Sequence, residues 1–369
     1  MFSVFVFFHS ERALYESKAL RVDAYLREEE SCRKGGIMKL LKVDTLAQAR
    51  ERLIKAAKEC LPETEQVALA DASDRILAED IVSGEMIPAF RRSSVDGYAV
   101  CSKDTAGATE SIPVFLKVLE EVEIGHPAVS KIEPGTCAYV PTGGMVPEGA
   151  DAMVMVEYSE RFGTDEVALY ENVPYGKCIV LPGEDVKTGD IVLKAGTRIG
   201  PAQAGTLAAL GVVQVPVFKP WKVAVLSTGD ELVRNDQVPG PGQVRDINTW
   251  ALSCYVKKTG LELVSAEAVR DEEVLLEEKI REAVKDCDLI LISGGSSQGK
   301  KDMTMEILNR ISKEGVFTHG LALKPGKPTI LGYDKEKHTL LGGLPGHPAA
   351  ALAVFHLLFV WLWKQVTGQ

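Results

Sequence analysis

The sequence lacks a surplus of positive charge and lacks paired cysteines. Its 42 Lys and Arg residues are outnumbered by 52 Asp and Glu residues, which gives a formal net charge of −10. A general nucleic-acid-binding surface is therefore not expected, and an anionic ligand would require a local cationic pocket. None of the seven cysteines forms a CxxC pair. This spacing excludes a zinc finger or a dithiol redox motif and predicts reduced thiols in a cytoplasmic protein.

Long apolar runs and the common phosphate-binding motifs are also absent. The apolar start, MFSVFVFF, has no basic segment before it and no cleavage site after it, so it is not typical of a signal peptide. Residues 349–363 are apolar, but they include His356 and are too few to span a bilayer. We expect a buried terminal helix there and no membrane partner. The sequence contains neither a Walker A motif nor a GxGxxG motif.

The length of 369 residues predicts two or three domains in a mixed α/β, multi-domain fold. Short β runs separated by Gly and Pro begin at residue 81, and a βαβ pattern begins at residue 221. We expect a poorly ordered extension, a discontinuous helical linker domain, a β-rich domain and an α/β domain, over residues 1–37, 38–80 plus 183–220, 81–182 and 221–369 respectively.

Two helices are expected before the β-rich region. Residues 45–61 have apolar side chains at helical spacing, and Thr45 with Gln48 predicts a capping box at the start. A second short helical stretch is expected over residues 74–80. From residue 221 onward, strands alternate with helices, which predicts a mostly parallel sheet covered by helices on both faces. Ligands bind beyond the carboxyl ends of the strands in such sheets.

Two of these predicted strands end in small polar residues. One strand is followed by Ser227, Thr228 and Gly229. The other, in LILISGGSSQGKKDMT, is followed by Ser293, Gly294, Gly295, Ser296, Ser297 and Gly299. Glycines let a ligand approach the backbone, and hydroxyl and N–H groups at a helix N-terminus suit a phosphate. A tight βα turn with a capped helix explains either loop equally well when it is taken alone.

Two proline-containing turns follow further along the chain. LALKPGKPTILG holds Lys324 and Lys327, with Pro328, on a stiff turn, and paired lysines suit a compact oxyanion. A charged surface turn is the alternative. GLPGHPAAAL places Pro345, Gly346 and His347 before a helix that begins at a proline.

Five carboxylates stand beside glycines or at the ends of predicted elements: Asp96, Asp185, Glu231, Asp271 and Asp302. Hard cations such as Mg²⁺ prefer oxygen ligands of this kind. A carboxylate beside a phosphate loop is unfavourable unless a metal bridges the two charges. Each of the five is, on its own, also an ordinary cap or turn residue.

Seven stretches occur in the order found in the MoeA/gephyrin-type molybdopterin molybdenumtransferases, which the sequence resembles over about residues 40–366: SSVDGYAV, PTGGMVPEGADAMVMVE, GEDVKTGDIVLKAGTRIG, VAVLSTGDEL, SGGSSQGKKD, KPGKP and GLPGHP. The resemblance implies an elongated homodimer that inserts molybdenum from molybdate into adenylylated molybdopterin, uses Mg²⁺ and releases AMP. It also implies an active site between the α/β domain of one subunit and the β-rich domain of the other.

The resemblance also implies roles for individual residues. Acidic positions linked to catalysis are matched by Asp96, Asp185, Glu231, Asp271 and Asp302. Of these, Glu231 and Asp302 would also bind the metal, and Thr142 falls in the PTGG loop. The phosphate end of the pterin would be held by Ser227, Thr228, Gly229, Ser293, Gly294, Gly295, Ser296, Ser297, Gly299, Pro345, Gly346 and His347. Molybdate would be held by Lys324, Lys327 and Pro328.

Three departures from the family pattern leave two functions open. His347 stands where the family has Asn, a stronger helix cap, at a cost of about 1 kcal/mol. Gly320 stands where some members have Lys. The chain stops at Gln369, whereas family enzymes continue into a small β domain that lends residues to the site. The alternatives are a molybdenumtransferase and a non-catalytic molybdopterin-binding paralogue that stores, carries or senses the cofactor.

Overall fold

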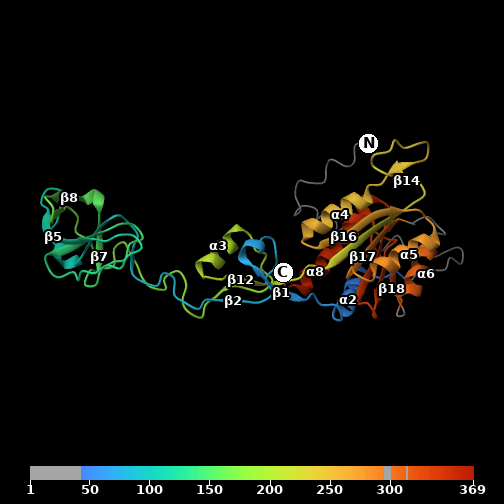
Figure 1. Ribbon diagram of the computed structural model, residues 1–369, viewed down its shortest axis with the longest axis horizontal. Helices are drawn as coiled ribbons and strands as arrows, with labels where there is room; N and C mark the ends of the chain where they lie inside the picture. The colour runs from blue at the N-terminus through green and yellow to red at the C-terminus, as the bar shows by residue number, and fades with distance from the viewer. Residues whose placement is uncertain (1–42, 295–300, 313–314) are drawn as a thin grey trace, which may run out of the picture.

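A computed structural model of the chain describes residues 43–294, 301–312 and 315–369, without the side chains of Lys301 and Asp302. Three parts follow one another along an elongated molecule: an α/β part, a small middle part and a β-rich part (Figure 1). Several expectations lie outside the described residues: the extension over residues 1–37 and the loop residues Gly295, Ser296, Ser297 and Gly299.

The α/β part is built on a six-stranded sheet with the order β16-β13-β17-β20-β19-β18. The strands are β13 (Lys222–Thr228), β16 (Glu262–Val269), β17 (Leu289–Gly294), β18 (Val316–His319), β19 (Ile330–Asp334) and β20 (Thr339–Leu344). The first four strands in this order are parallel to one another. Strand β19 is antiparallel to both of its neighbours. The expected, mostly parallel sheet is therefore a mixed sheet.

Helices cover both faces of this sheet, because alternate strand residues point to opposite faces and both sets are apolar. In β13, Val223 and Val225 join one core, and Ala224 and Leu226 join the other. The first face is covered by α2 (Leu46–Ala57), α4 (Asn248–Thr259), α7 (Pro348–Val354), the π-helical η4 (Phe355–Val360) and α8 (Trp361–Val366). The second is covered by α5 (Glu273–Ala283) and α6 (Lys301–Ile311).

Helix α2 corrects part of the expected domain grouping. The predicted capping box is confirmed: the Gln48 N–H donates to Thr45 Oγ1 at 3.2 Å, and the Thr45 N–H donates to Gln48 Oε1 at 2.9 Å. However, the apolar stripe of the helix, Ala49, Leu53 and Ala57, lies in the core of the α/β part. Helix α2 therefore does not form one unit with residues 183–220, because this stripe is buried against the six-stranded sheet.

The middle part is formed by chain segments from both sides of the β-rich part. Strand β1 (Thr64–Ala68) and the 3-10 turn η1 (Leu69–Asp71) come first, and α3 (Pro201–Ala209) and β12 (Gln214–Phe218) come later. Strands β1 and β12 pair antiparallel. The helix expected over residues 74–80 is wrong. Asp74 has a φ of +62°, and Ile76 and Leu77 form bridges with Arg198 and Val217 instead.

The β-rich part is a second six-stranded sheet, with the order β7-β4-β6-β5-β9-β8. Its strands are β4 (Gly97–Val100), β5 (Val114–Glu121), β6 (Thr136–Val140), β7 (Ala152–Met155), β8 (Ser159–Phe162) and β9 (Glu166–Leu169), with 3-10 turns η2 (Ser102–Thr105) and η3 (Val156–Tyr158). Two separate clusters of buried side chains form on this sheet.

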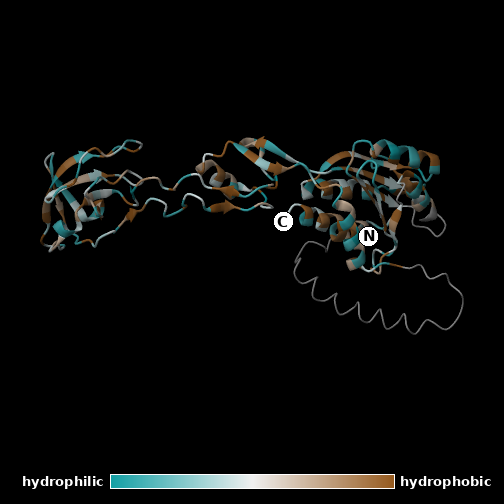
Figure 2. Cartoon of the chain, turned by 90° about the horizontal axis from the view of Figure 1, so that it is seen from below, coloured by the Kyte–Doolittle hydropathy of each residue, from teal (hydrophilic) through white to brown (hydrophobic). Residues whose placement is uncertain are grey.

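A connector made of two antiparallel segments of the chain joins the middle and β-rich parts (Figure 1). It contains two antiparallel pairs: β2 (Ile81–Val82) with β11 (Ile191–Leu193), and β3 (Arg92–Ser93) with β10 (Ile179–Val180). Hydrophobic residues occur along the connector as well as inside the parts (Figure 2). The exposed large hydrophobic residues on the connector are Val82, Met86, Phe90, Leu181 and Ile191.

The last helix is longer than the sequence suggests. Residues Pro348–Val366 form 19 helical residues, which by length and composition alone could cross a membrane. Half of the apolar stretch of this helix is buried inside the protein. Phe355, Phe359 and Trp363 are among the largest fully buried side chains and belong to the α/β core. The expected buried terminal helix is confirmed, but the expectation that it is too short to span a bilayer is wrong.

Candidate functional site

The candidate site lies at the carboxyl ends of β13 and β17. Strand β13 lies between β16 and β17 in the sheet. The chain leaves β13 toward α4 on one face and leaves β17 toward α6 on the other. The two exits therefore diverge at this point, and such a switch point is where open α/β sheets bind ligands. A short parallel pair, β14 (Leu232–Val233) with β15 (Val244–Arg245), lies in the connection from β13 to α4.

The structure brings the two small-residue strand ends together, as the sequence predicts. In the parallel pairing of β13 with β17, Ser227 lies beside Ser293, and Thr228 lies beside Gly294. Gly294 has a φ of +130°, and a Cβ atom there would lie 1.9 Å from the carbonyl oxygen of Thr228. Only glycine allows the two strand ends to approach this closely.

Two of the five predicted carboxylates, Glu231 and Asp271, lie around the ends of β13 and β16, together with Asp230. The Thr228 hydroxyl donates to the Asp271 carboxylate, and the Asp271 N–H donates to Asp230 Oδ1 at 3.3 Å. The Glu231 carboxylate folds back over Gly229, where an added Cβ would lie 2.8 Å from its Oε2. In the described part of the chain, no group of three or more His, Cys, Asp or Glu side chains is arranged to hold a metal.

Asp302 is the second residue of α6, the helix that follows β17. Its side chain lies outside the described residues, so its predicted role at the metal remains a prediction.

The lysine turn lies at the same edge of the sheet. Both β18 and β20 are antiparallel to β19, so β18 runs parallel to β20, and the turn after β18 lies beside the carboxyl ends of β17 and β20. The Leu321 N–H donates to the Lys327 carbonyl at 3.0 Å, and Thr329 Oγ1 donates to the Gly326 carbonyl at 2.7 Å. These bonds fix the backbone and leave the Lys324 and Lys327 side chains exposed.

The Pro345–His347 turn follows β20 at this same edge. Ser293 Oγ donates to the Pro345 carbonyl at 3.2 Å, which ties the turn to the end of β17. His347 is the N-cap residue of α7, but its side chain makes no capping hydrogen bond. The prediction that His347 is a weak cap is therefore confirmed.

Asn248 and Thr249, in the first turn of α4, were missed from the sequence. Asn248 Nδ2 donates to Ser293 Oγ at 2.7 Å and to the Gly346 carbonyl at 2.8 Å. Thr249 Oγ1 donates to Ser227 Oγ at 2.8 Å. Polar residues at a helix start resemble ordinary caps. The available signal was that this helix follows the strand next to the switch point.

Asp96, Thr142 and Asp185 lie elsewhere in the chain. Asp96 Oδ1 accepts hydrogen bonds from the Thr142 N–H at 2.7 Å and from the Thr142 hydroxyl at 3.0 Å. Asp185 forms an ion pair with Arg92 on the connector at 3.1 Å. Figure 1 shows the β-rich part and the α/β part at opposite ends of the molecule. A single chain therefore does not bring the five predicted acids together.

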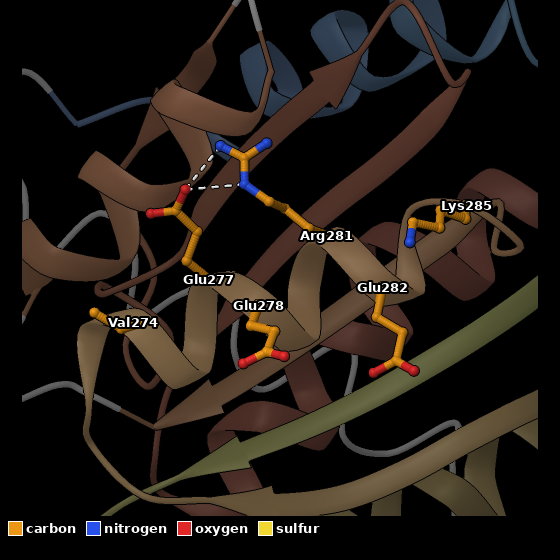
Figure 3. A pocket seen from close by; sticks show the side chains of 6 residues that line it. All are labelled: Val274, Glu277, Glu278, Arg281, Glu282 and Lys285. Atoms are coloured by element: carbon orange, nitrogen blue, oxygen red, sulfur yellow. Dashed lines mark hydrogen bonds and ion pairs between the residues drawn. The ribbon is translucent and has the colours of Figure 1, made fainter.

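A surface hollow along α5 is not the candidate site. Helix α5 and the residues just after it line this hollow with Val274, Glu277, Glu278, Arg281, Glu282 and Lys285 (Figure 3). Arg281 donates to Glu277 at 2.7 and 2.9 Å and, with Arg310, lowers the pKa of Glu277. Such exposed pairs are typical of a solvated helix surface. No strand end contributes to the hollow.

Comparison with known proteins covers most of the chain. Residues 44–211 match the MoeA N-terminal region (domain I and II), and residues 224–364 match a probable molybdopterin binding domain. A molybdopterin molybdenumtransferase of Haemophilus influenzae is 34% identical over 329 residues, which are 88% of this chain and 78% of the relative. The solved structure of a molybdopterin biosynthesis MoeA protein from Pyrococcus horikoshii is 37% identical, with a TM-score of 0.74 over 89% of this chain and 81% of that chain.

Proposed function

Because the chain belongs to the molybdopterin molybdenumtransferase family, we propose that it inserts molybdenum from molybdate into adenylylated molybdopterin and releases AMP. One observation carries this proposal: the ends of β13 and β17, the lysine turn and the Pro345–His347 turn all lie at one edge of one sheet. This edge combines close backbone approach, hydroxyl groups and exposed positive charge, which together suit a phosphorylated substrate and an oxyanion.

The phosphate end of the pterin would bind at the ends of β13 and β17. Gly229 and Gly294 leave the backbone accessible there, and hydroxyl groups stand beside them at Ser227, Thr228 and Ser293. Thr228 donates its hydroxyl proton to Asp271, so a phosphate oxygen at this position would be bound by backbone N–H groups, or by the Thr228 hydroxyl after it turns from Asp271 to the ligand.

Molybdate would bind at Lys324 and Lys327, with Pro328 completing the turn. Both lysine side chains are exposed, and neither forms an ion pair with a residue that the structure describes. Two ammonium groups on a hydrogen-bonded turn balance the charge of a compact dianion. The turn would hold molybdate close to the bound pterin because both lie at one edge of the sheet.

The residues near this edge also fit Mg²⁺. This ion is usually bound through one or two carboxylates together with substrate phosphates, rather than in a cage made by the protein alone. Glu231 and Asp302 would supply those carboxylates, and no cage of three or more ligands is present in the described part of the chain. Bound Mg²⁺ would neutralise phosphate charge. Asp271 would hold the Thr228 side chain in place through the hydrogen bond that it accepts.

We also propose that the protein is a cytoplasmic homodimer with its active site shared between the two subunits. Asp96 directly precedes β4 of the β-rich part, and Asp185 lies on the connector between β10 and β11, so both are outside the α/β part that contains the strand-end site. A second copy of the chain would supply them, and the apolar residues exposed on the connector would gain cover in a dimer. The described cysteines are free thiols, as expected in a reducing compartment.

Turnover tests the activity. Purified protein is mixed with adenylylated molybdopterin, Mg²⁺ and molybdate, and AMP release is followed. Glu231→Gln and Asp302→Asn are expected to abolish AMP release while leaving the melting temperature and the pterin affinity nearly unchanged. Wild-type protein that binds the pterin without turnover would favour the storing, carrying or sensing paralogue. Wild-type protein that does not bind the pterin would refute both functions.

Mixing two inactive variants tests the shared site. Asp96→Asn and Glu231→Gln place their lesions in opposite parts of the chain. If the two parts meet across subunits, a mixed dimer has one site with both lesions and one intact site. Random exchange of equal amounts then restores roughly one quarter of wild-type activity. Activity no greater than that of the separate variants, after exchange is verified by mass spectrometry, would contradict the shared site.

A further inference from the structure

A buried polar cluster lies directly beneath the candidate site. Its side chains come from three elements: the first turn of α4, the end of β13 and the end of β17. Ser227 and Ser293 are each 1% exposed, Thr249 is 7% exposed and Asn248 is 9% exposed. Polar groups this deeply buried are normally all hydrogen-bonded.

Asn248 links two of the turns that form the site. Its side-chain Nδ2 donates one hydrogen to Ser293 Oγ at the end of β17 and the other to the Gly346 carbonyl after β20. Ser293 in turn donates its own proton to the Pro345 carbonyl. The Gly346 carbonyl can only accept, so the orientation of the Asn248 amide is fixed by its neighbours.

The other end of the same amide has no partner. Asn248 Oδ1 is buried and accepts no hydrogen bond. A buried acceptor without a donor costs free energy. The amide therefore keeps the orientation in which it donates to Ser293 and Gly346, and its own oxygen is left without a hydrogen-bond donor. Local violations of this kind are expected where function constrains the structure.

We propose that Asn248 is a positioning residue, which holds Ser293 and the Pro345–Gly346 turn at the separation needed to bind the phosphorylated pterin. This inference rests on the proposed function of the same site. The side chain acts through Ser293 and Gly346 and does not itself touch the ligand, because its oxygen is inaccessible. Thr249, which donates to Ser227, ties β13 to the same helix turn.

The test compares Asn248→Asp, Asn248→Ala and wild-type protein. Asn248→Asp preserves the side-chain shape but removes both donated hydrogen bonds. Asn248→Ala removes them without adding charge and carries the test if Asn248→Asp fails to fold. The Kd for adenylylated molybdopterin is measured by equilibrium binding, alongside kcat, KM and melting temperature. We expect the Kd and KM to rise about tenfold or more, the scale of one or two lost hydrogen bonds, and kcat to change by less.

Ser253→Ala is the matched control. Ser253 is on the same helix, and its hydroxyl is also buried without a partner, but it donates to none of the site turns. Its removal is expected to leave the Kd unchanged. A double-mutant cycle of Asn248→Ala with Ser293→Ala tests the route of the effect. If Asn248 acts through Ser293, the two changes in binding free energy are expected to be strongly non-additive.

The outcomes separate this inference from the proposed function. A folded Asn248→Ala variant with a Kd within twofold of wild type would overturn the positioning role and leave the function standing. Full additivity in the cycle would also overturn it, because the effect would not pass through Ser293. Wild-type protein that binds no pterin would overturn both.

Discussion

At Asp288, burial and the contact with Lys222 shift the pKa of the carboxyl group in opposite directions. Asp288 precedes β17, at the edge of the sheet opposite the candidate site, and its Oδ2 accepts the Lys222 N–H at 2.7 Å. Burial raises the pKa of the Asp288 carboxyl above its ordinary value of 3.8 despite that hydrogen bond. The folded state therefore binds the proton more tightly than the unfolded state does, and stability is lost as the pH rises through the raised pKa.

Asp288→Asn is expected to remove this pH dependence. Asparagine retains an oxygen for the Lys222 N–H but carries no charge that must be desolvated. The variant is expected to melt at the same temperature as wild type near pH 3 and at an equal or higher temperature at pH 7. Melting curves across this range check the result, with the exposed Asp286→Asn as control. A variant that loses stability relative to wild type as the pH rises would contradict the prediction.

Cysteine reactivity is a second property of single residues. Burial raises the pKa of Cys60 and Cys137 to about 12 and that of Cys287 to about 11. Since the thiolate is the reactive form, these three thiols are expected to be alkylated slowly at pH 8. Cys254 is exposed on α4 and is expected to react first. Peptide mass spectrometry after brief iodoacetamide treatment gives the order, and equal rates at all four positions would show that burial does not protect them.

At the scale of the element, the start of α7 lacks a side-chain cap. His347 occupies the N-cap position in an extended conformation but makes no side-chain hydrogen bond. His347→Asn is expected to raise stability by about 1 kcal/mol, the typical value of an N-cap. His347→Ala is expected to be nearly neutral, because no bond is lost. Urea unfolding measures both, and equal stability of the Asn and Ala variants would show that no cap forms.

The end of β17 depends on glycine at one position. Gly294 has a φ of +130° and lies against the Thr228 carbonyl, so Gly294→Ala introduces both backbone strain and a clash. We expect a loss of about 2 kcal/mol or more, together with weaker pterin binding. The control is Gly205→Ala in α3, where an added Cβ meets no atom within 4 Å. That change is expected to stabilise the protein by about 0.5–1 kcal/mol. Thermal melts that rank the two variants in the opposite order would contradict the argument.

The sequence was sufficient to predict elements whose signal is local. The capping box at Thr45 and the βαβ order after residue 221 both follow from short-range patterns, and both are present. The helix expected over residues 74–80 failed because bridges to distant residues override its composition. The reversal of β19 was also missed, since the direction of a strand depends on the path of the whole chain.

The candidate site was predictable to the same degree. The ends of β13 and β17 met as expected, because neighbouring parallel strands end at one edge of a sheet. Asn248 was missed because a buried link between two turns leaves no periodic trace in the sequence. The separation of Asp96 from Glu231 within one subunit was implied only by the family resemblance, since the order of motifs along a chain carries no information about distance.

At the scale of the whole molecule, the β-rich part is an insertion with adjacent ends. Ser93 pairs with Ile179 where the connector enters this part. The buried clusters of the β-rich sheet contain only residues from within it, so it shares no core with the rest of the chain. Replacing residues 94–178 with a short Gly-Ser linker is expected to leave the α/β part folded and able to bind the pterin.

The same deletion is expected to abolish AMP release, because it removes Asp96. Calorimetry checks that the shortened protein still folds, equilibrium binding checks that it still binds the pterin, and the AMP-release assay checks the loss of activity. Loss of all cooperative unfolding in the shortened protein would show that the β-rich part supports the others. Retained AMP release would show that Asp96 is not needed.

The nesting of the three parts sets the order in which a growing chain can complete them. The residues of the β-rich clusters lie within one continuous stretch of sequence. That part can therefore fold first, since domains generally fold as units during synthesis. The middle part must wait for β12 to pair with β1. Helix α2 is made before both, yet its core partners include Phe355 and Trp363 near the other end of the chain. An amphipathic helix thus stays uncovered until the residues of η4 and α8 have been synthesised.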